Sequence, residues 1–309
     1  MSGSALVCAS GIGDGLLMMI VAHHLKKKGL SPTIFHDKAN ALSPLFPSHT
    51  FKAHQPIESL KHFDLILVEN DHSKRAWDLF RKREESALPQ IKFLFPTQSP
   101  LFKKGDILFN PKVPIATNLA HACTTLFQSD FSKANDLSLP SSAIHKKYPK
   151  RVVIHPTSND RKRNWMPASF LKLSKLLTEK GFDPIFCVAP HERHQWEKRV
   201  QNLPVFASLK EIAHYIYESH FFIGNDSGLG HLASNLGIET VTISGNPKRV
   251  RMWRPDWAYG KVVTLPYPLP NFKGINFPLR ENYWPYFISS KKVFNTFTEL
   301  AYESGCRLF

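Results

Sequence analysis

Asp226, Ser227 and His231 lie close together in the stretch FFIGNDSGLGHLASNLG (residues 221–237), and these residue types can do chemistry. Together they are the side chains of a hydrolytic triad. A nucleophilic serine, however, normally lies in a GxSxG turn, whereas Ser227 directly follows Asp226. Ser227 and His231 also have the four-residue spacing of one helix face. We therefore reject a hydrolase and interpret the stretch as a strand followed by a helix.

The start of this helix has the features of an anion site, or of a simple helix cap supplied by Ser227. Gly228 and Gly230 leave the first backbone N–H groups uncovered, where the helix dipole places partial positive charge. A phosphate group would bind there. Asp226 would then accept hydrogen bonds from sugar hydroxyls, and His231 would add a donor in the first turn.

A second Gly-rich turn, SGIGDG (residues 10–15), follows an apolar run near the N-terminus. Gly11, Gly13 and Gly15 allow a tight turn and a close approach of a ligand to the backbone. Asp14 is the ionisable residue of this turn, and two roles are open to it. It caps the following helix, or it is a carboxylate base at the mouth of a cleft.

The loop HPTSNDRKRNW (residues 155–165) combines hydroxyl groups with positive charge after a predicted strand. Its hydroxyls belong to Thr157 and Ser158, and its central cations are Lys162 and Arg163. Hydroxyls and cations together at a strand end suit the binding of a diphosphate. The alternative is a solvated basic loop.

Glu192 is a further candidate, because it follows the predicted strand PIFCVA (residues 184–189). A carboxylate at that place can accept hydrogen bonds from the two hydroxyls of a ribose. The run HERH (residues 191–194) separates its histidines by three positions, whereas zinc-binding helices need four, so a surface helix is favoured. The four cysteines are scattered and form no CxxC, and no metal site is predicted.

These loops connect segments that alternate between strand-like and helix-like patterns in both halves of the chain. The alternation predicts the α/β class, with doubly wound parallel sheets whose ligands bind at the carboxyl ends of strands. The predicted strands are residues 5–10, 33–35, 64–69, 91–95, 151–158, 184–189, 221–224 and 239–244, and the main predicted helices are 167–181, 191–201, 209–219 and 289–305.

Two domains are predicted, because 309 residues are long for a single core. The first covers residues 1–145 and the second residues 150–285. The polar segment 129–150, which contains Pro and Ser, is interpreted as the linker. The C-terminal helix, within residues 289–309, is expected to pack back on the first domain.

The chain has 40 Lys and Arg against 25 Asp and Glu, which gives a formal net charge of +15. This excess favours an anionic partner, or it is a generally basic surface. No nucleic-acid-binding motif accompanies it, so nucleic acid is not an expected partner. The sequence predicts neither a targeting segment nor a run long enough to cross a bilayer, and the expected location is cytoplasmic.

Four segments in order resemble glycosyltransferase family 9, the bacterial heptosyltransferases of lipopolysaccharide core synthesis. They are GIGDGL, HPTSNDRKRNWMPASF, PHE at 190–192 and GNDSGLGHLASNLGIETVTISG. The resemblance implies a GT-B fold, in which two Rossmann-like domains face a cleft. The first domain would bind the acceptor and the second the nucleotide sugar. The implied reaction is inverting transfer of heptose from ADP-heptose, without a metal ion or cofactor.

The resemblance also implies roles for single residues. Asp14 matches the catalytic base, and the phosphate-binding lysine of the family falls on Arg163, with Lys162 beside it. A basic segment at 243–257 replaces the small Gly-Pro-Thr loop expected in the family. The positions that match the donor site are Gly13, Thr157, Ser158, Glu192, Asp226, Ser227, Gly228 and His231.

The implied acceptor is a hydroxyl of the anionic lipopolysaccharide inner core, made of Kdo and heptose. A protein that acts on it would be peripheral on the cytoplasmic face of the inner membrane. One alternative is a GT-B glycosyltransferase that uses another nucleotide sugar or a protein acceptor. Another is a non-catalytic protein that binds a nucleotide sugar. An epimerase of the same fold has no clear support in the sequence.

Overall fold

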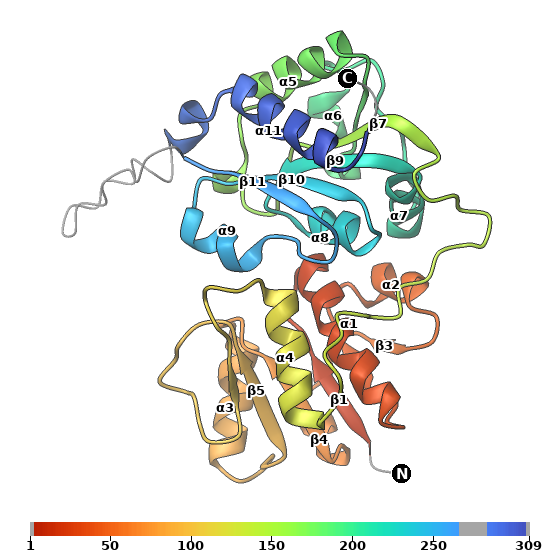
Figure 1. The fold of residues 1–309 in the computed structure, drawn as a ribbon. Helices are drawn as coiled ribbons and strands as arrows, with labels where there is room; N and C mark the ends of the chain where they lie inside the picture. Colours follow the sequence, from red (N-terminus) through yellow and green to blue (C-terminus); the bar gives the residue numbers. More distant parts are fainter. Residues whose placement is uncertain (1–2, 266–282, 307–309) are drawn as a thin grey trace, which may run out of the picture. The chain divides into compact units, whose positions relative to one another are not determined.

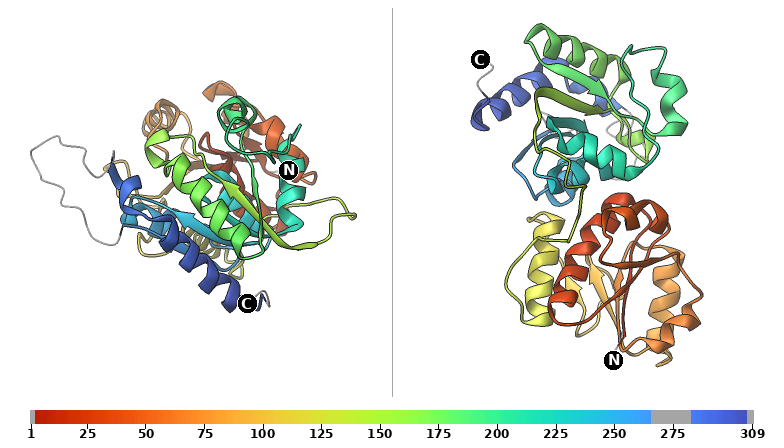
Figure 2. Two further views of the ribbon diagram at one scale, coloured as in Figure 1. Left: turned by 90° about the horizontal axis from the view of Figure 1, so that it is seen from above. Right: turned by 90° about the vertical axis from the view of Figure 1, so that its right-hand side faces the viewer.

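The computed structural model describes residues 3–265 and 283–306, and the chain divides into two compact units. The units are Met1–Leu139 and Pro140–Phe309, so the division lies inside the polar segment that we interpreted as a linker. Each unit contains one parallel sheet with helices on both faces (Figures 1 and 2). The α/β architecture predicted from the alternating pattern is therefore confirmed.

The first unit contains a six-stranded parallel sheet in the order β3-β2-β1-β4-β5-β6. Its central strands are apolar runs because both faces are covered; β4, for example, has the sequence LILVE and is almost entirely buried. The strands are β1 (Ser4–Val7), β2 (Thr33–Phe35), β3 (Thr50–Lys52), β4 (Leu65–Glu69), β5 (Ile91–Phe95) and β6 (Ile107–Leu108); the helices are α1 (Ile12–Lys27), α2 (Ala39–Leu42), η1 (Ser43–Leu45), η2 (Ile57–His62), α3 (Lys74–Glu84) and α4 (Ile115–Phe127).

The second unit contains a five-stranded parallel sheet in the order β11-β10-β9-β7-β8. The strands are β7 (Tyr148–His155), β8 (Asp183–Phe186), β9 (Ser219–Asn225), β10 (Glu239–Ile243) and β11 (Gly260–Val263). The helices are η3 (Arg161–Arg163), α5 (Pro167–Glu179), η4 (Pro190–Glu192), α6 (Arg193–Trp196), α7 (Leu209–Tyr217), α8 (Gly228–Asn235), α9 (Pro247–Trp253), η5 (Trp284–Phe287) and α11 (Ser290–Glu303).

Both sheets reverse their winding direction next to their first strand. In the first unit the reversal lies between β1 and β4, and in the second it lies between β7 and β9. The loops that leave two such strands run to opposite faces of the sheet, so they leave a crevice at the strands' carboxyl ends, where ligands of this architecture bind. The turn with Asp14 follows β1, and the turn with Ser227 follows β9.

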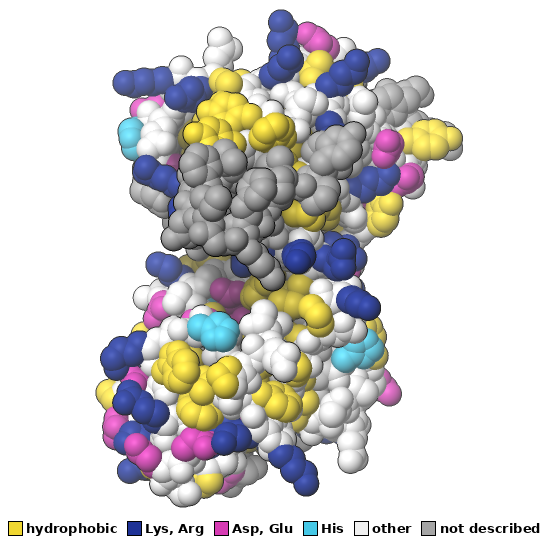
Figure 3. Space-filling model, turned by 90° about the vertical axis from the view of Figure 1, so that its left-hand side faces the viewer, with side chains coloured by type: hydrophobic (Ala, Val, Ile, Leu, Met, Phe, Trp, Pro, Cys, Tyr) yellow, Lys and Arg dark blue, Asp and Glu magenta, His cyan; other side chains and the backbone are white. Residues whose placement is uncertain are grey.

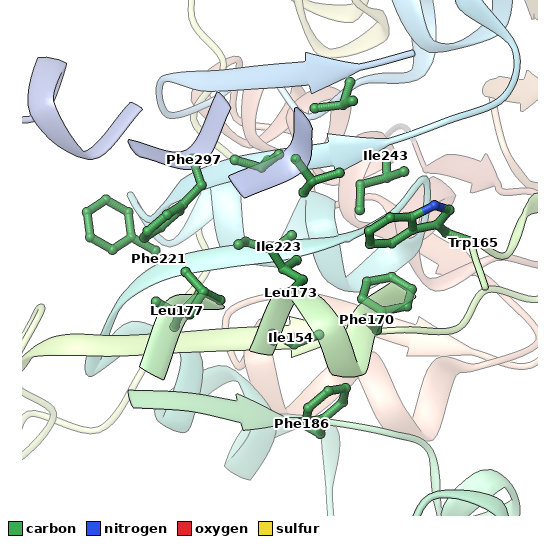
Figure 4. Packing of buried hydrophobic residues seen from close by; sticks show 14 of the residues in the cluster. Ile154, Trp165, Phe170, Leu173, Leu177, Phe186, Phe221, Ile223, Ile243 and Phe297 are labelled. Atoms are coloured by element: carbon green, nitrogen blue, oxygen red, sulfur yellow. The ribbon is translucent and has the colours of Figure 1, made fainter. Parts of the chain in front are cut away.

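The C-terminal helix α11 packs on the second unit, so the expectation that it returns to the first domain is wrong. It contacts α5, β10 and β11, and its Phe297 packs edge-on against Phe221 of β9, with ring centroids 5.1 Å apart (Figure 4). The apolar face of this helix is buried in the core of this unit. The amphipathic pattern in the sequence predicted that one face of this helix is buried, but not that the second unit covers it.

The segment 191–201 differs most from its predicted form. The sequence predicts one long helix there, whereas the structure has η4 followed by the single turn α6. Trp196 is buried and stacks on Phe186 at a centroid distance of 5.2 Å, but its neighbours remain largely exposed. A helix with one buried side chain lacks the apolar face that stabilises longer helices in proteins. Elsewhere β2 and β5 have the predicted bounds.

No helix in the described ranges combines the length and the apolar character that a bilayer span requires.

We predict that Gly224→Ala destabilises the second unit by about 1–3 kcal/mol, as overpacking of a core does. A Cβ atom at this position of β9 would lie 2.8 Å from the carbonyl oxygen of His155 on β7. Because these two strands are paired, neither backbone can move away freely. The measurement is urea unfolding followed by circular dichroism.

Gly230→Ala is the matched control, because its new Cβ would make only ordinary van der Waals contacts, with the Pro255 ring at 3.4 Å and the Phe222 ring at 3.8 Å. This variant should unfold at or above the wild-type midpoint, since alanine favours a helix. Equal midpoints for Gly224→Ala and the wild type would contradict the prediction.

Candidate active site

The buried carboxamide of Asn225 joins the two loops at the switch point of the second unit. Its Nδ2 donates a hydrogen bond to the carbonyl oxygen of Pro156 at 2.8 Å. Its Oδ1 accepts a hydrogen bond from the backbone N–H of Trp165 at 2.9 Å. Asn225 is 1% exposed, so both bonds form away from solvent. They hold the two ends of the loop 156–165 against the end of β9. Sequence reasoning did not select this residue.

Two tryptophan side chains anchor the basic turn η3 and the residues that follow it. The indole N–H of Trp284 donates to the carbonyl oxygen of Lys162 at 2.8 Å, and that of Trp165 donates to the carbonyl oxygen of Ile288 at 3.0 Å. Asp160 caps the turn by accepting the backbone N–H of Lys162 at 3.0 Å. The backbone of this turn is therefore positioned, while the Lys162 side chain remains exposed.

Arg163 is directed toward the start of α8. One of its terminal nitrogens lies 3.8 Å from Oδ2 of Asp226, and its Nε lies 3.8 Å from Oδ2 of Asp160. Its side chain is 30% exposed. Of the two cations that the sequence left open, Arg163 is thus the one that the structure brings next to the predicted anion site.

Ser227 occupies the cap position of α8 but does not cap it. Its side chain accepts no hydrogen bond from the first turn of the helix. Its Oγ is buried and has no hydrogen-bond partner among the described residues. By contrast, the side chains of Ser73, Ser208 and Ser289 cap α3, α7 and α11. The simple capping role is therefore excluded, and the arrangement favours an anion site at the N-terminus of α8.

Asp226 lies between two arginine side chains. Nε of Arg249, in the first turn of α9, donates to Oδ2 of Asp226 at 2.9 Å, and Arg163 approaches the same oxygen. The Asp226 side chain is only 6% exposed. One buried carboxylate thus lies between two guanidinium groups, of which that of Arg163 also approaches Asp160. The basic character of segment 243–257 was the available signal for Arg249, but it did not identify Asp226 as the partner.

The predicted donor residues of the β7 and β8 loops are brought together. Oγ1 of Thr157 donates to Oε2 of Glu192 at 2.9 Å, and the backbone N–H of Ala189 donates to the same oxygen at 3.2 Å. Oγ of Ser158 donates to Oδ1 of Asn164 at 2.8 Å. Thr157 and Glu192 therefore form one polar group, while Ser158 stabilises its own loop.

His231 lies in the first turn of α8 and is 4% exposed. Burial lowers its pKa below the ordinary value, partly opposed by the negative charge of Asp226. Its Nδ1 has no hydrogen-bond partner among the residues that the structure describes. The imidazole is therefore neutral at neutral pH and lies inside the unit, next to the anion site rather than on its surface.

In the first unit, Asp14 lies in the first turn of α1, one residue after Gly13. Its Oδ2 accepts a hydrogen bond from the backbone N–H of Gly11 at 3.1 Å. The capping role that the sequence left open is thus present. A carboxylate with this contact has a defined orientation, which is also what a general base requires. The two roles are compatible, and the structure places Asp14 at the switch point.

A cavity of about 270 Å³ lies in the first unit at the carboxyl ends of β1 and β4. Burial, followed by the charge of Arg75, lowers the pKa of His54. A hydrogen bond from Ser10 holds the pKa of Asp37 below its ordinary value. At neutral pH the cavity therefore presents neutral imidazole, ionised carboxylate and guanidinium groups together. Its polar lining consists of Ser10, Asp37, His54, Glu69, Asp71 and Arg75, together with Ser73.

Three solved structures share the fold over nearly the whole chain. Heptosyltransferase WaaC of E. coli with ADP matches with a TM-score of 0.66 and 13% identity, over 97% of this chain and 100% of that one. E. coli ADP-heptose LPS heptosyltransferase II matches with a TM-score of 0.69 and 14% identity, over 99% and 100%. A glycosyltransferase family 9 protein of Veillonella parvula DSM 2008 has a TM-score of 0.65 and 14% identity, over 98% of each chain. These likenesses confirm the GT-B fold.

The sequence itself matches the profile of glycosyltransferase family 9 (heptosyltransferase) over residues 104–268. No curated protein gives a sequence match to this chain. The profile match covers more than half of the chain, and its range contains both loops of the second unit's switch point. The chain therefore belongs to glycosyltransferase family 9 and is a glycosyltransferase.

Proposed function

We propose that this enzyme transfers heptose from ADP-heptose to a hydroxyl of a lipopolysaccharide inner-core acceptor, with inversion at the anomeric carbon. The donor binds to the second unit, and Asp14 of the first unit is the general base. The reaction uses neither a metal ion nor a cofactor. Similar structures have been solved with ADP and with ADP-2-deoxy-2-fluoro heptose, which supports the choice of donor.

The observation that carries this proposal is the uncapped N-terminus of α8 beside two arginines. Backbone N–H groups and the Ser227 hydroxyl would bind the donor's diphosphate, and Arg163 would neutralise it. Lys162, exposed on the neighbouring turn, adds charge. Asp226 would accept hydrogen bonds from the sugar, and Glu192 from the ribose. His231 supports the helix start from inside.

Catalysis would then rest on charge stabilisation and on one proton transfer. Asp14 accepts the proton of the acceptor hydroxyl as its oxygen attacks the anomeric carbon. The bond to the diphosphate breaks, and the leaving group keeps the electron pair as negative charge. Fixed N–H groups and arginine side chains stabilise that charge without reorganising. In this role they replace a divalent metal ion.

The acceptor would use the cavity of the first unit. Carboxylates such as Asp37 can accept hydrogen bonds from sugar hydroxyls, and Arg75 can bind one acidic group of a Kdo-bearing acceptor. Lys and Arg side chains are spread over both units on the face drawn in Figure 3. This distribution suits attraction to an anionic inner-leaflet surface rather than one localised binding patch.

The donor assignment is tested by thermal-shift titration with ADP-, GDP- and UDP-sugars. We expect ADP-heptose to raise the melting temperature, because ligand bound to the native state alone stabilises it. Transfer is then followed by mass spectrometry with a Kdo-bearing lipid A acceptor. Stabilisation by GDP- or UDP-sugars in place of ADP-heptose would contradict the donor assignment.

Asp14→Asn should lower kcat about 10²–10⁴-fold, which is the usual contribution of a general base. ADP-heptose affinity should stay unchanged, because the proposed donor groups lie in the second unit. Asparagine can still accept the Gly11 N–H, so the helix start is preserved. Asp64→Asn, at an exposed carboxylate of the same unit, is the control. Wild-type turnover by Asp14→Asn would rule out Asp14 as the base.

The phosphate cations are tested by titrating ADP into Arg163→Ala and Lys162→Ala. Loss of one charge-assisted hydrogen bond should weaken binding about 10-fold or more in Arg163→Ala. The effect in Lys162→Ala should be smaller, because this side chain is exposed. Lys172→Ala, which removes an exposed lysine from α5, controls for net charge. If ADP binds all three variants equally, the proposed diphosphate position is wrong.

A further inference from the structure

Glu69 is a nearly buried carboxyl group at the switch point of the first unit, next to the turn that carries Asp14. It is the last residue of β4, and Val68 pairs with Val7 of β1. Its Oε2 accepts a hydrogen bond from the backbone N–H of Ala9 at 3.0 Å. Ala9 lies between β1 and α1, and Glu69 is 6% exposed. The carboxyl group at the end of β4 therefore contacts the backbone of the loop 8–11 through Ala9.

No Lys, Arg or His forms an ion pair with Glu69 within the described residues. The titratable groups around it are mainly acidic. Asp14 faces it from α1 and Asp71 from its own loop, while Cys8 lies beside it. On the cavity side, Asp37, His54 and Arg75 share the lining. A buried carboxylate without a cation is strongly disfavoured, and the group avoids this cost by keeping its proton.

The electrostatics agree with this geometry. Burial, followed by the negative charge of Asp14, raises the pKa of Glu69 well above its ordinary value, although the Ala9 N–H acts in the opposite direction. Burial and the charges of Glu69 and Asp14 likewise raise the pKa of the Cys8 thiol. Both shifts favour the neutral forms of the Glu69 carboxyl group and of the Cys8 thiol.

We propose that Glu69 is a positioning residue for Asp14: its protonated carboxyl group holds the loop 8–11 and leaves Asp14 as the charged member of the pair. The negative charge of Asp14 disfavours ionisation of Glu69, so one charged and one neutral carboxyl group is the favoured combination. An ionised Glu69 would favour protonation of Asp14, and a protonated base accepts no proton. This role in catalysis rests on the proposed function of Asp14, whereas the protonation state of Glu69 does not.

The protonation state is tested by comparing the melting temperatures of Glu69→Gln and the wild type from about pH 5 to about pH 8. The native wild type keeps a proton that the unfolded chain releases above about pH 4.3. Wild-type stability therefore falls as the pH rises toward the native pKa, and glutamine, which does not titrate, removes this loss. The advantage of Glu69→Gln should grow steadily with pH.

Glu58→Gln, at an exposed carboxyl group of the same unit, is the matched control and should show a constant difference from the wild type. A constant difference for Glu69→Gln as well would overturn the proposal, because Glu69 would then ionise as it does in the unfolded chain.

The positioning role is tested by hydrogen exchange of residues 5–17 in the full-length protein. Glu69→Ala leaves the Ala9 N–H without its acceptor, so exchange in this segment should become about 10-fold faster. Glu69→Gln keeps an acceptor and should restore the protected rate. Equal exchange in Glu69→Ala and the wild type would overturn the positioning role.

Kinetics with ADP-heptose and the Kdo-bearing acceptor separate a neutral from a charged role. Glu69→Ala should lower kcat without changing the donor KM, and Glu69→Gln should restore most of the loss. Because glutamine does not titrate, the pH–rate profile of Glu69→Gln should lack the alkaline decline in kcat that ionisation of Glu69 causes in the wild type. If Glu69→Gln is as slow as Glu69→Ala, a negative charge is needed and the proposal is wrong. Absence of transfer in the wild type would count against the proposed function, while melting and exchange would still decide the role of Glu69.

Discussion

The candidate donor site depends on the two hydrogen bonds of the Asn225 carboxamide. Both are buried, and leaving either partner unpaired would cost about 1–3 kcal/mol. Because both partners belong to the loop after β7, Asn225 holds the basic turn against the end of β9. The next residue is Asp226, and α8 begins two residues later. One side chain therefore sets the position of Arg163 relative to the helix start, and the sheet order β9-β7 makes that contact possible.

The two switch points treat a buried carboxyl group in opposite ways. Asp226 forms an ion pair with Arg249 and is approached by Arg163, so neighbouring guanidinium groups compensate its negative charge. Glu69 is equally inaccessible but has one backbone N–H and acidic neighbours, so the same physics favours its neutral form. The switch point of the second unit thereby holds two arginine side chains beside the start of α8. In the first unit, a neutral Glu69 adds no negative charge beside Asp14.

Structural features that depend only on neighbouring residues could be predicted from the sequence. The strands β2 and β5, the start of α8 after Ser227, and the position of Asp14 after β1 follow from short apolar runs and Gly-rich turns. Both domains and their parallel sheets followed from the alternation of such segments.

Contacts between distant segments could not be predicted in the same way. Asn225 and Trp165 are 60 residues apart, as are Glu69 and Ala9. Neither pair has a spacing that a helix or turn would reveal. Helix α11 illustrates the same limit. Its amphipathic pattern predicts which side chains are buried, but not which elements cover them. The helix predicted over 191–201 failed for a related reason, since only tertiary packing decides whether its apolar side is covered.

The unused hydroxyl of Ser227 is informative because, among the described residues, the other serines at the N-cap of an α-helix do cap it. An N-cap side chain contributes about 1 kcal/mol to a helix, and Ser73, Ser208 and Ser289 make that bond. Helix α8 forgoes it, although its buried Leu232 shows that the helix is packed. Departures from a local rule in a natural protein are concentrated at functional sites. A diphosphate at this place would satisfy N–H groups that the fold has already oriented, so binding requires no reorganisation of the helix.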